Sequence, residues 1–452
     1  MQPPQFDPNK TMIGGPGQGP DLQRTQAVNV SATVGPSITA TVFPGRTASM
    51  ANGPAREQFL IEIEARRDPG LPGIASGSQR TPLNLCLVLD RSGSMEGPPL
   101  EYAKQACQYV VDLLGPNDIL SIVTFEEVVN VLMPPQRVSV KDPIKAGIAA
   151  ITAGNTTDLY GGIAQGLNQV VQSNEPGRAT RLVILSDGDP TTGIKDFASL
   201  TAFAGEVKAK GVTATFLGFG PDYNEELLAT MARKAGGNYA YIPRPELIPE
   251  VFRLEVDKMM AAAATNLSLS LDMARWVNLR GGTGITTPPT GDKLTIPLAD
   301  LEQGAVIQQL LDFEFPNHPL GHYRIAAATL QFDDASTGKV QTIPIDLVIE
   351  FTADASRYRA PVDPRVANAA ELSFASRAVE KTIMGMKSGQ ITSQMAIAEL
   401  QKTQAMMLKD GRVQDAQEVT MALRALSTGD MDTAQKTLMG TMVNLDQGKK
   451  TT

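Results

Sequence analysis

Residues 83–95 read Leu-Asn-Leu-Cys-Leu-Val-Leu-Asp-Arg-Ser-Gly-Ser-Met, a largely apolar run followed by a polar turn. The apolar residues show no regular alternation with polar ones, which is typical of a strand buried on both faces of a parallel sheet. Asp90 ends the run, and Ser92 and Ser94 follow in a turn that contains Gly93. The stretch therefore predicts one carboxylate and two hydroxyls exposed at the carboxyl end of a buried strand.

The sequence that follows alternates between apolar runs and amphipathic stretches. This pattern predicts a mostly parallel sheet with helices on both faces, an α/β doubly wound, Rossmann-like fold. Ligands of such sheets bind at the carboxyl ends of the strands, near the point where the strand order reverses. The expected strands are Leu83–Leu89, Ile119–Phe125, Leu182–Leu185, Val212–Phe219 and Tyr239–Ile242. The expected helices are Leu100–Leu114, Pro143–Ala153, Leu159–Gln172, Phe197–Lys210, Glu225–Ala235 and Ile248–Ala264.

Two further segments supply oxygen atoms at the same predicted edge of the sheet. Residues 154–159 read Gly-Asn-Thr-Thr-Asp-Leu and begin a helix, so a threonine hydroxyl lies at its tip. Residues 182–188 read Leu-Val-Ile-Leu-Ser-Asp-Gly, a second buried strand that ends on an aspartate. If the three loops converge, they form a shell of hard oxygen ligands that suits Mg²⁺, Mn²⁺ or Ca²⁺.

These three pieces resemble the metal-ion-dependent adhesion site of von Willebrand factor type A (VWA) domains. That site has Asp-x-Ser-x-Ser after the first strand, a threonine before the third helix and Asp-Gly after the fourth strand. The resemblance extends over roughly Leu83 to Asp257, including the order of strands and helices. It implies a bound divalent cation, most simply Mg²⁺, held by Asp90, Ser92, Ser94, Thr157 and Asp187.

The threonine of this set carries a one-residue ambiguity, because Thr156 and Thr157 are adjacent. In the family, the threonine directly precedes an Asp or Asn followed by a hydrophobic residue. The pair Asp158-Leu159 fits this description and favours Thr157.

Alternating apolar residues, typical of half-buried strands, flank the α/β segment on both sides. They occur at Ile38–Val42 and Phe59–Ala65, and again after Thr265. We expect residues 27–80 and 265–356 to form one β-sandwich, with a VWA domain over 82–264 inserted between them. This arrangement resembles bacterial relatives of the inter-alpha-trypsin inhibitor heavy chains.

The two ends of the chain differ in character. Residues 363–447 have apolar residues at helical spacing, and Gly389, Gly411 and Gly429 divide them into four helices of a C-terminal bundle. Residues 1–26 are rich in Pro, Gly and Gln, which is typical of a disordered tail. Thr11 in this tail is a candidate for phosphorylation and capture by a phosphothreonine-binding module.

Composition excludes several classes of partner. The net charge of −8 argues against a nucleic acid or an anionic membrane surface. The sequence contains no apolar run of membrane-spanning length and no basic-then-apolar signal pattern. The only cysteines, Cys86 and Cys107, lie in apolar segments and are expected to be buried thiols of a cytoplasmic protein, with a disulfide as the alternative.

The resemblance implies a metal-dependent protein-interaction or adaptor module, in which the cation binds a carboxylate supplied by a protein partner. One alternative is a scaffold for self-assembly with a purely structural cation. Another is a metal-dependent hydrolase, but the neighbourhood of the expected cation contains no histidine or cysteine, and Ser94 lacks a Gly-x-Ser-x-Gly context. We therefore expect a protein that is not an enzyme.

Overall fold

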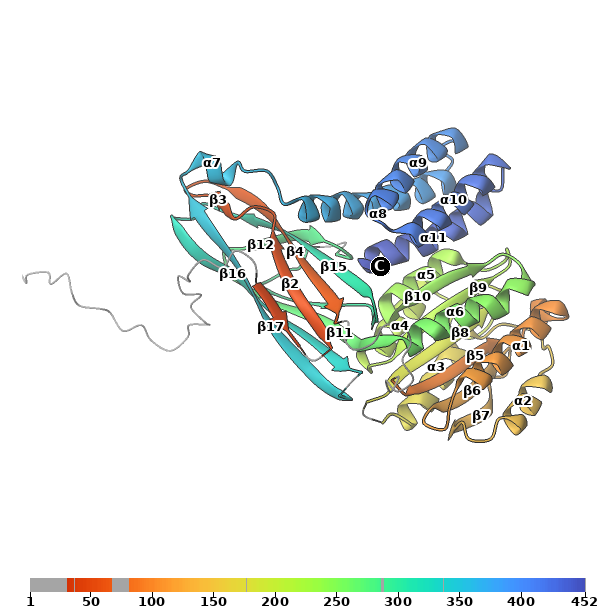
Figure 1. Ribbon diagram of the computed structural model, residues 1–452. Helices are drawn as coiled ribbons and strands as arrows, with labels where there is room; N and C mark the ends of the chain where they lie inside the picture. The colour runs from red at the N-terminus through yellow and green to blue at the C-terminus, as the bar shows by residue number, and fades with distance from the viewer. Residues whose placement is uncertain are drawn as a thin grey trace, which may run out of the picture.

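The structure is a computed structural model that describes residues 31–35, 37–66, 81–175, 177–285, 288–335 and 337–451. It consists of an α/β part, two further β-sheets and a group of C-terminal helices (Figure 1). The tail predicted over residues 1–26, with Thr11, lies outside the described residues.

The α/β part is built on a six-stranded sheet in the order β10-β9-β8-β5-β6-β7. The chain moves from β5 to β6 on one side and later to β8 on the other, so the strand order reverses beside β5. All neighbours are parallel except β7, which runs antiparallel to β6. The strands are β5 (Leu83–Asp90), β6 (Ile119–Phe125), β7 (Asn130–Arg137), β8 (Ala179–Ser186), β9 (Thr213–Phe219) and β10 (Gly236–Ile242).

Helices cover both faces of this sheet, as the sequence predicts (Figure 1). One face packs against α3, α4 and α5, and the other packs against α1, α2 and α6. The doubly wound fold is thereby confirmed. The helices are α1 (Pro98–Leu113), α2 (Asp142–Ala149), α3 (Leu159–Gln172), α4 (Phe197–Ala209), α5 (Glu225–Ala235) and α6 (Ile248–Met260), with short 3-10 turns η1 (Gly93–Met95) and η2 (Pro245–Leu247).

Three details of this part differ from the prediction. The helix expected over Pro143–Ala153 ends already at Ala149. Strand β7 was not expected, because it is a half-exposed edge strand containing Pro134 and Pro135 and therefore has no apolar run. The helix expected over Ile248–Ala264 ends at Met260, and Ala262 begins β11. Alanine favours helices, but pairing of Ala264 with Asp334 and burial in the sheet core override that preference.

Two six-stranded sheets form the second part, and each contains strands from before and after the α/β segment. Ile63 pairs with Ile307 where β4 lies along β15. One continuous hydrophobic core contains residues of both sheets, and the two sheets together are called the sandwich below. The first sheet contains β1 (Ser31–Val34), β2 (Ile38–Pro44), β4 (Ala55–Ala65), β15 (Ala305–Phe315), β12 (Asn278–Gly282) and β18 (Lys449–Thr451). The second contains β13 (Lys293–Pro297), β11 (Ala262–Met273), β16 (Gly321–Asp334), β17 (Lys339–Thr352), β3 (Ala48–Met50) and β14 (Leu301–Glu302).

The C-terminal segment forms the four helices expected from its glycines. Gly389, Gly411 and Gly429 have positive φ angles of 71°, 77° and 83° and each follows a helix end. Glycine adopts this conformation without the strain that a Cβ would cause. After the short α7 (Ala355–Tyr358), the helices are α8 (Pro364–Lys387), α9 (Ser393–Lys409), α10 (Val413–Ser427) and α11 (Met431–Asp446).

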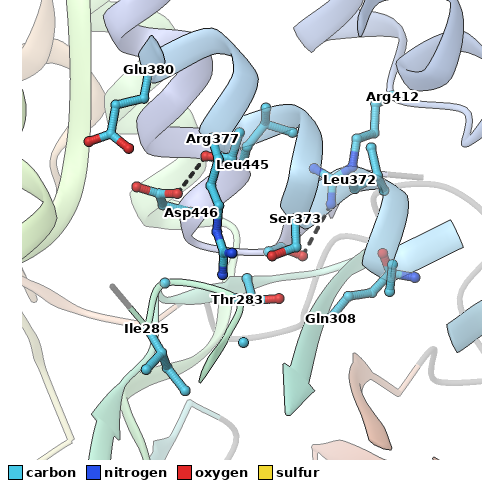
Figure 2. A pocket seen from close by; sticks show the side chains of 15 residues that line it. Thr283, Ile285, Gln308, Leu372, Ser373, Arg377, Glu380, Arg412, Leu445 and Asp446 are labelled. Atoms are coloured by element: carbon cyan, nitrogen blue, oxygen red, sulfur yellow. Dashed lines mark hydrogen bonds between the residues drawn. The ribbon is translucent and has the colours of Figure 1, made fainter. Parts of the chain in front are cut away.

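These four helices, called the helical bundle below, contact both other parts of the molecule. A narrow pocket lies where α8 and the end of α11 meet the β12 edge of the sandwich (Figure 2). At this junction, Asp446 accepts hydrogen bonds from Ser376 (2.6 Å) and from Arg233 of α5 (2.8 Å). Arg412 donates to the backbone oxygen of Lys449 at 2.6 Å. The bundle is thus fixed to the sandwich and to the α/β part together.

Candidate metal centre

Asp90 lies at the carboxyl end of β5, where the strand order of the α/β sheet reverses. Its side chain is fully buried and accepts hydrogen bonds from the Ser92 backbone N–H at 2.9 Å and from the Ser186 hydroxyl at 2.7 Å. Burial raises the pKa of Asp90 to about 6, and the charge of Asp187 adds to this effect. A buried carboxylate beside a second one is costly unless a positive charge accompanies them.

The two serines converge on the second aspartate. Ser94 donates a hydrogen bond to Asp187 Oδ1 at 2.8 Å, and the Ser92 hydroxyl lies 3.4 Å from the same oxygen. The two hydroxyl oxygens are 3.2 Å apart. Ser92 is buried whereas Ser94 is exposed, so this cluster of side-chain oxygen atoms is open to solvent on the Ser94 side. Burial also raises the pKa of Asp187.

Both candidate threonines lie at the start of α3. Thr157 is buried, and a Cβ added to Gly188 would lie 3.8 Å from its hydroxyl oxygen, so this hydroxyl faces the turn that follows Asp187. The Thr157 backbone N–H donates to Thr191 Oγ1 at 2.9 Å, which ties this segment to the loop after β8. The Thr156 hydroxyl is buried without a hydrogen-bond partner among the described residues.

Residues that the sequence did not single out hold these loops together. Arg91 forms an ion pair with Glu126 at 3.1 Å, and its backbone oxygen accepts a hydrogen bond from Gly154 at 2.6 Å. Glu126 in turn accepts the Asn155 backbone N–H at 3.3 Å. Hydrogen bonds from the backbone N–H groups of Glu127, Asn155 and Val128 hold the pKa of Glu126 below its usual value. The pair thus connects the turn after β5 to the loop before α3.

The donor set fits a hard divalent cation. It contains two carboxylates whose mutual repulsion a cation would relieve, together with neutral hydroxyls, and oxygen ligands of this kind suit Mg²⁺, Mn²⁺ and Ca²⁺. Over the part of the chain that the structure describes, no cluster of three or more His, Cys, Asp or Glu side chains offers a different metal site. Cys86 and Cys107 are both buried free thiols and lie outside the donor set.

Residues 84–253 match the family profile of the von Willebrand factor type A domain. The chain contains a VWA domain. VWA domains mediate protein–protein interactions, often through a divalent metal bound at a site of this kind. The family resemblance drawn from Asp90, Ser92, Ser94 and the two later segments is therefore confirmed.

The sequence relatives include bacterial and animal proteins. The chain is 28% identical over 330 residues to the uncharacterized protein sll0103 of Synechocystis, covering 69% of this chain and 74% of that protein. It is 27% identical to human inter-alpha-trypsin inhibitor heavy chain H4, over 36% of this chain and 18% of that protein. The second match is therefore confined to a small part of a much longer protein.

Two solved structures share the fold over most of the chain. A von Willebrand factor type A protein from Catenulispora acidiphila has a TM-score of 0.67 and 15% identity, covering 88% of this chain and 92% of that one. The ArnB paralog VWA2 from Sulfolobus acidocaldarius has a TM-score of 0.64 and 18% identity, and the match covers 90% of this chain and 98% of that one. The similarity therefore extends beyond the VWA domain.

Proposed function

We propose that this protein is a metal-dependent interaction module that works as an adaptor. Asp90, Ser92, Ser94, Thr157 and Asp187 would hold one divalent cation, Mg²⁺ in the simplest case, with Mn²⁺ or Ca²⁺ as alternatives. The observation that carries the proposal is the convergence of the Ser92 and Ser94 hydroxyls on Asp187 Oδ1, beside the buried carboxylate of Asp90.

A cation bound here would act as an electrophile for a carboxylate of a protein partner. The serine and threonine hydroxyls would add no negative charge to that of Asp90 and Asp187, so the cation would still attract a further oxygen ligand at an open position. Ser94 is exposed, so an incoming side chain can reach this side of the group. Removing the partner's carboxylate should cost about 2–5 kcal/mol of binding free energy.

An interaction role is favoured over hydrolysis by the surroundings of the site. The only histidines of the chain, His318 and His322, lie on the sandwich, where His322 pairs with Glu350 at 3.1 Å. The Ser94 hydroxyl donates to Asp187, itself a proposed metal ligand, and no histidine forms a hydrogen bond with it among the described residues. We therefore propose that the protein is not an enzyme.

The net charge and the cysteines of the chain support proposals on the kind of partner and the cellular compartment. The net charge of −8 supports a protein partner over a nucleic acid. No helix within the described ranges is long and apolar enough to cross a membrane. We propose a cytoplasmic protein, supported by the two free buried thiols, and we retain Thr11 as a candidate for a phosphothreonine reader.

The proposal is tested by capturing partners with the full-length protein in Mg²⁺ and in EDTA. Asp90→Ala serves as the site variant, and Asp354→Ala, at the exposed aspartate directly before α7, serves as the matched control. A partner retained only in Mg²⁺, lost with Asp90→Ala and kept with Asp354→Ala supports the proposal. A partner retained equally under all conditions would favour the scaffold role with a structural cation.

A further inference from the structure

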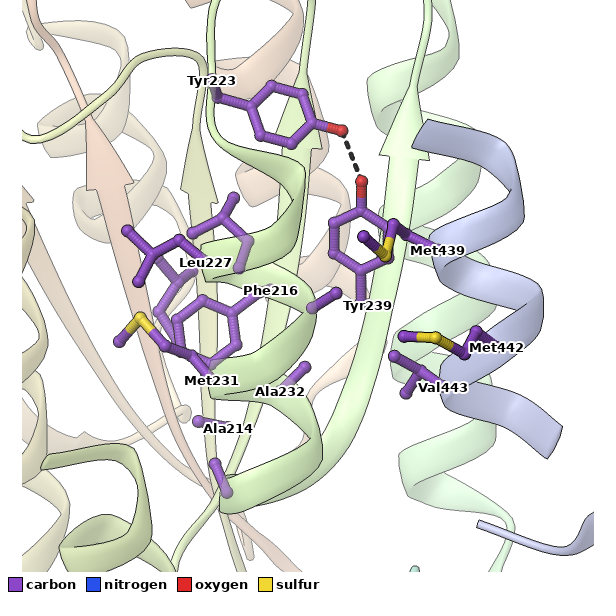
Figure 3. Packing of buried hydrophobic residues seen from close by; sticks show 14 of the residues in the cluster. Ala214, Phe216, Tyr223, Leu227, Met231, Ala232, Tyr239, Met439, Met442 and Val443 are labelled. Carbon is purple, nitrogen blue, oxygen red and sulfur yellow. Dashed lines mark hydrogen bonds between the residues drawn. The ribbon is translucent and has the colours of Figure 1, made fainter. Parts of the chain in front are cut away.

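The loops around the metal centre are held in different ways on the two sides of the α/β sheet. On the β10 side the helical bundle supports them, because Met439 and Met442 of α11 lie in one hydrophobic cluster with Tyr239 of β10 (Figure 3). The Tyr239 hydroxyl lies 2.7 Å from that of Tyr223, which belongs to the loop between β9 and α5. Strand β6 lies beyond β5, on the side away from β10. The segments on that side are connected through Glu126, the residue that directly follows β6.

Glu126 joins three segments next to the metal centre. One oxygen of its carboxylate forms the 3.1 Å ion pair with Arg91, in the turn after β5. The other oxygen accepts the Asn155 backbone N–H at 3.3 Å, in the loop before α3. The backbone oxygen of Glu126 accepts the Asp158 N–H at 2.9 Å. Glu126 is buried, and a buried carboxylate that loses its partners is costly, so these contacts are a fixed feature of the folded chain.

Two backbone hydrogen bonds join the turn after β5 to the loop before α3 directly. The Gly154 N–H donates to the Arg91 oxygen at 2.6 Å, and the Gly93 N–H donates to the Asn155 oxygen at 3.1 Å. Gly93 lies between the two proposed serine ligands, and Asn155 lies two residues before the proposed threonine ligand. The spacing of these two segments therefore decides how far apart the hydroxyl ligands lie.

The Glu126 side chain fills the space beside the loop before α3. A Cβ added to Gly154 would lie 2.7 Å from Glu126 Cγ and 2.9 Å from its Oε2, closer than atoms in contact can approach. The carboxylate thus lies directly against the backbone of this loop, while its other oxygen holds Arg91. Because protein interiors are closely packed, the loop cannot approach the turn without displacing Glu126.

The spacing of oxygen ligands is what distinguishes the two commonest hard divalent cations. Mg²⁺ requires a near-octahedral arrangement with bonds of about 2.0–2.1 Å, whereas Ca²⁺ accepts about 2.3–2.6 Å and a variable geometry. A site whose ligand segments are rigidly spaced can therefore favour Mg²⁺. The same ligands on loosened segments lose Mg²⁺ more readily than Ca²⁺.

We propose that Glu126 is a positioning residue that sets the cation selectivity of the metal centre. By holding Arg91 and the loop before α3, it fixes the spacing between the serine and threonine ligands and favours Mg²⁺ over Ca²⁺. The inference rests on the proposed function. Glu126 acts through the segments that it joins and is not one of the five proposed ligands.

The test measures the Mg²⁺ and Ca²⁺ affinities of the full-length protein by titration calorimetry. Glu126→Ala removes the ion pair and the bond to Asn155, and Glu127→Ala, at the exposed neighbour, is the control with the same change of charge. Glu126→Ala should weaken Mg²⁺ binding about 10- to 100-fold, as is usual for groups that orient metal ligands. Ca²⁺ binding should weaken by about threefold or less, because Ca²⁺ tolerates longer bonds. Glu127→Ala should leave the ratio of the two affinities unchanged.

The ratio is the decisive quantity, because a lost charge or a general loss of stability would weaken both divalent cations alike. Gly154→Ala is a second variant that keeps the charge of Glu126 but displaces its side chain, and Gly154 has no positive φ that would exclude alanine. It should shift the ratio toward Ca²⁺ as well. Thermal unfolding in EDTA fixes a temperature at which every variant is folded.

An unchanged Mg²⁺ to Ca²⁺ ratio in Glu126→Ala or in Gly154→Ala would overturn the inference, even if both affinities fell. An equal shift in Glu127→Ala would overturn it too. Binding of neither cation by the wild type would instead overturn the proposed function.

Discussion

Ser94 donates a 2.8 Å hydrogen bond to Asp187, a residue 93 positions further along the chain. The contact exists because β5 and β8 are parallel neighbours, so that both strands end at the same edge of the sheet. The pairing of these two strands thereby brings oxygen-bearing side chains that are far apart in the sequence into one cluster.

The hydroxyl of Ser186 should prove important for cation binding, although it is not one of the proposed ligands. It donates to Asp90 Oδ2 at 2.7 Å and orients that carboxylate. Ser186→Ala should weaken Mg²⁺ binding about 10- to 100-fold, as is usual for groups that orient a metal ligand. Ser199→Ala, in α4, is the matched control. Equal Mg²⁺ affinities for both variants, measured by calorimetry, would show that Asp90 needs no such support.

The adjacent threonines should differ in their effect on cation binding. Thr157→Ala should weaken Mg²⁺ binding far more than Thr156→Ala, because the Thr157 hydroxyl faces the turn that follows Asp187. Serine at either position keeps the hydroxyl and serves as the control. A stronger loss with Thr156→Ala than with Thr157→Ala would move the ligand by one position.

Glu57 should make the stability of the protein depend on pH. Burial raises its pKa to about 7 from the ordinary glutamate value of 4.5, despite the ion pair with Arg46 at 3.2 Å. Between these two values the folded state binds more protons than the unfolded state, so the free energy of unfolding falls as pH rises from about 4.5 to 7. The loss attributable to Glu57 is at most about 3 kcal/mol.

Urea unfolding of the wild type and of Glu57→Gln at pH 5 and pH 8 measures this contribution. The wild type should lose more stability than the variant between the two pH values, because glutamine does not titrate. Glu418, whose pKa is also about 7, remains in both proteins and serves as an internal reference. An identical pH dependence in both proteins would contradict the assignment to Glu57.

The VWA domain should fold as an isolated fragment, whereas the following strands should not. A fragment of residues 82–261 retains all six strands of the α/β sheet. A fragment of residues 262–356 lacks β4, the strand along which β15 pairs from Val306 to Phe315, and exposes an unpaired edge. Circular dichroism and light scattering should show a folded monomer for the first and aggregation for the second. A soluble, folded second fragment would argue against a sandwich built from both flanks.

The fold and the candidate ligands could be predicted because their signals are local. Strands buried on both faces produce apolar runs. Asp90 at the end of β5 and Asp187 directly after β8 mark the edge at which ligands of such sheets bind. The edge strand β7 has no such run and was missed. The alanines at 262–264 favour helix until pairing with distant strands overrides them.

The supporting residues were not predictable in the same way. Arg91 and Glu126 look like ordinary solvated charges in the sequence, and only the folded chain places them 3.1 Å apart between two loops of the site. Lys436 of α11 is buried, although lysine side chains on helices are usually exposed to solvent. Its burial depends on how α11 packs against the loop between β9 and α5, which no local pattern encodes.

The central claim is that Asp90 and its neighbours hold a divalent cation. Titration of the metal-free protein with Mg²⁺ tests it most directly, using wild type, Asp90→Ala and the control Asp354→Ala. We predict one Mg²⁺ per chain for the wild type and the control, and no binding by Asp90→Ala with its circular dichroism spectrum unchanged. Equal Mg²⁺ binding by wild type and Asp90→Ala would contradict the account.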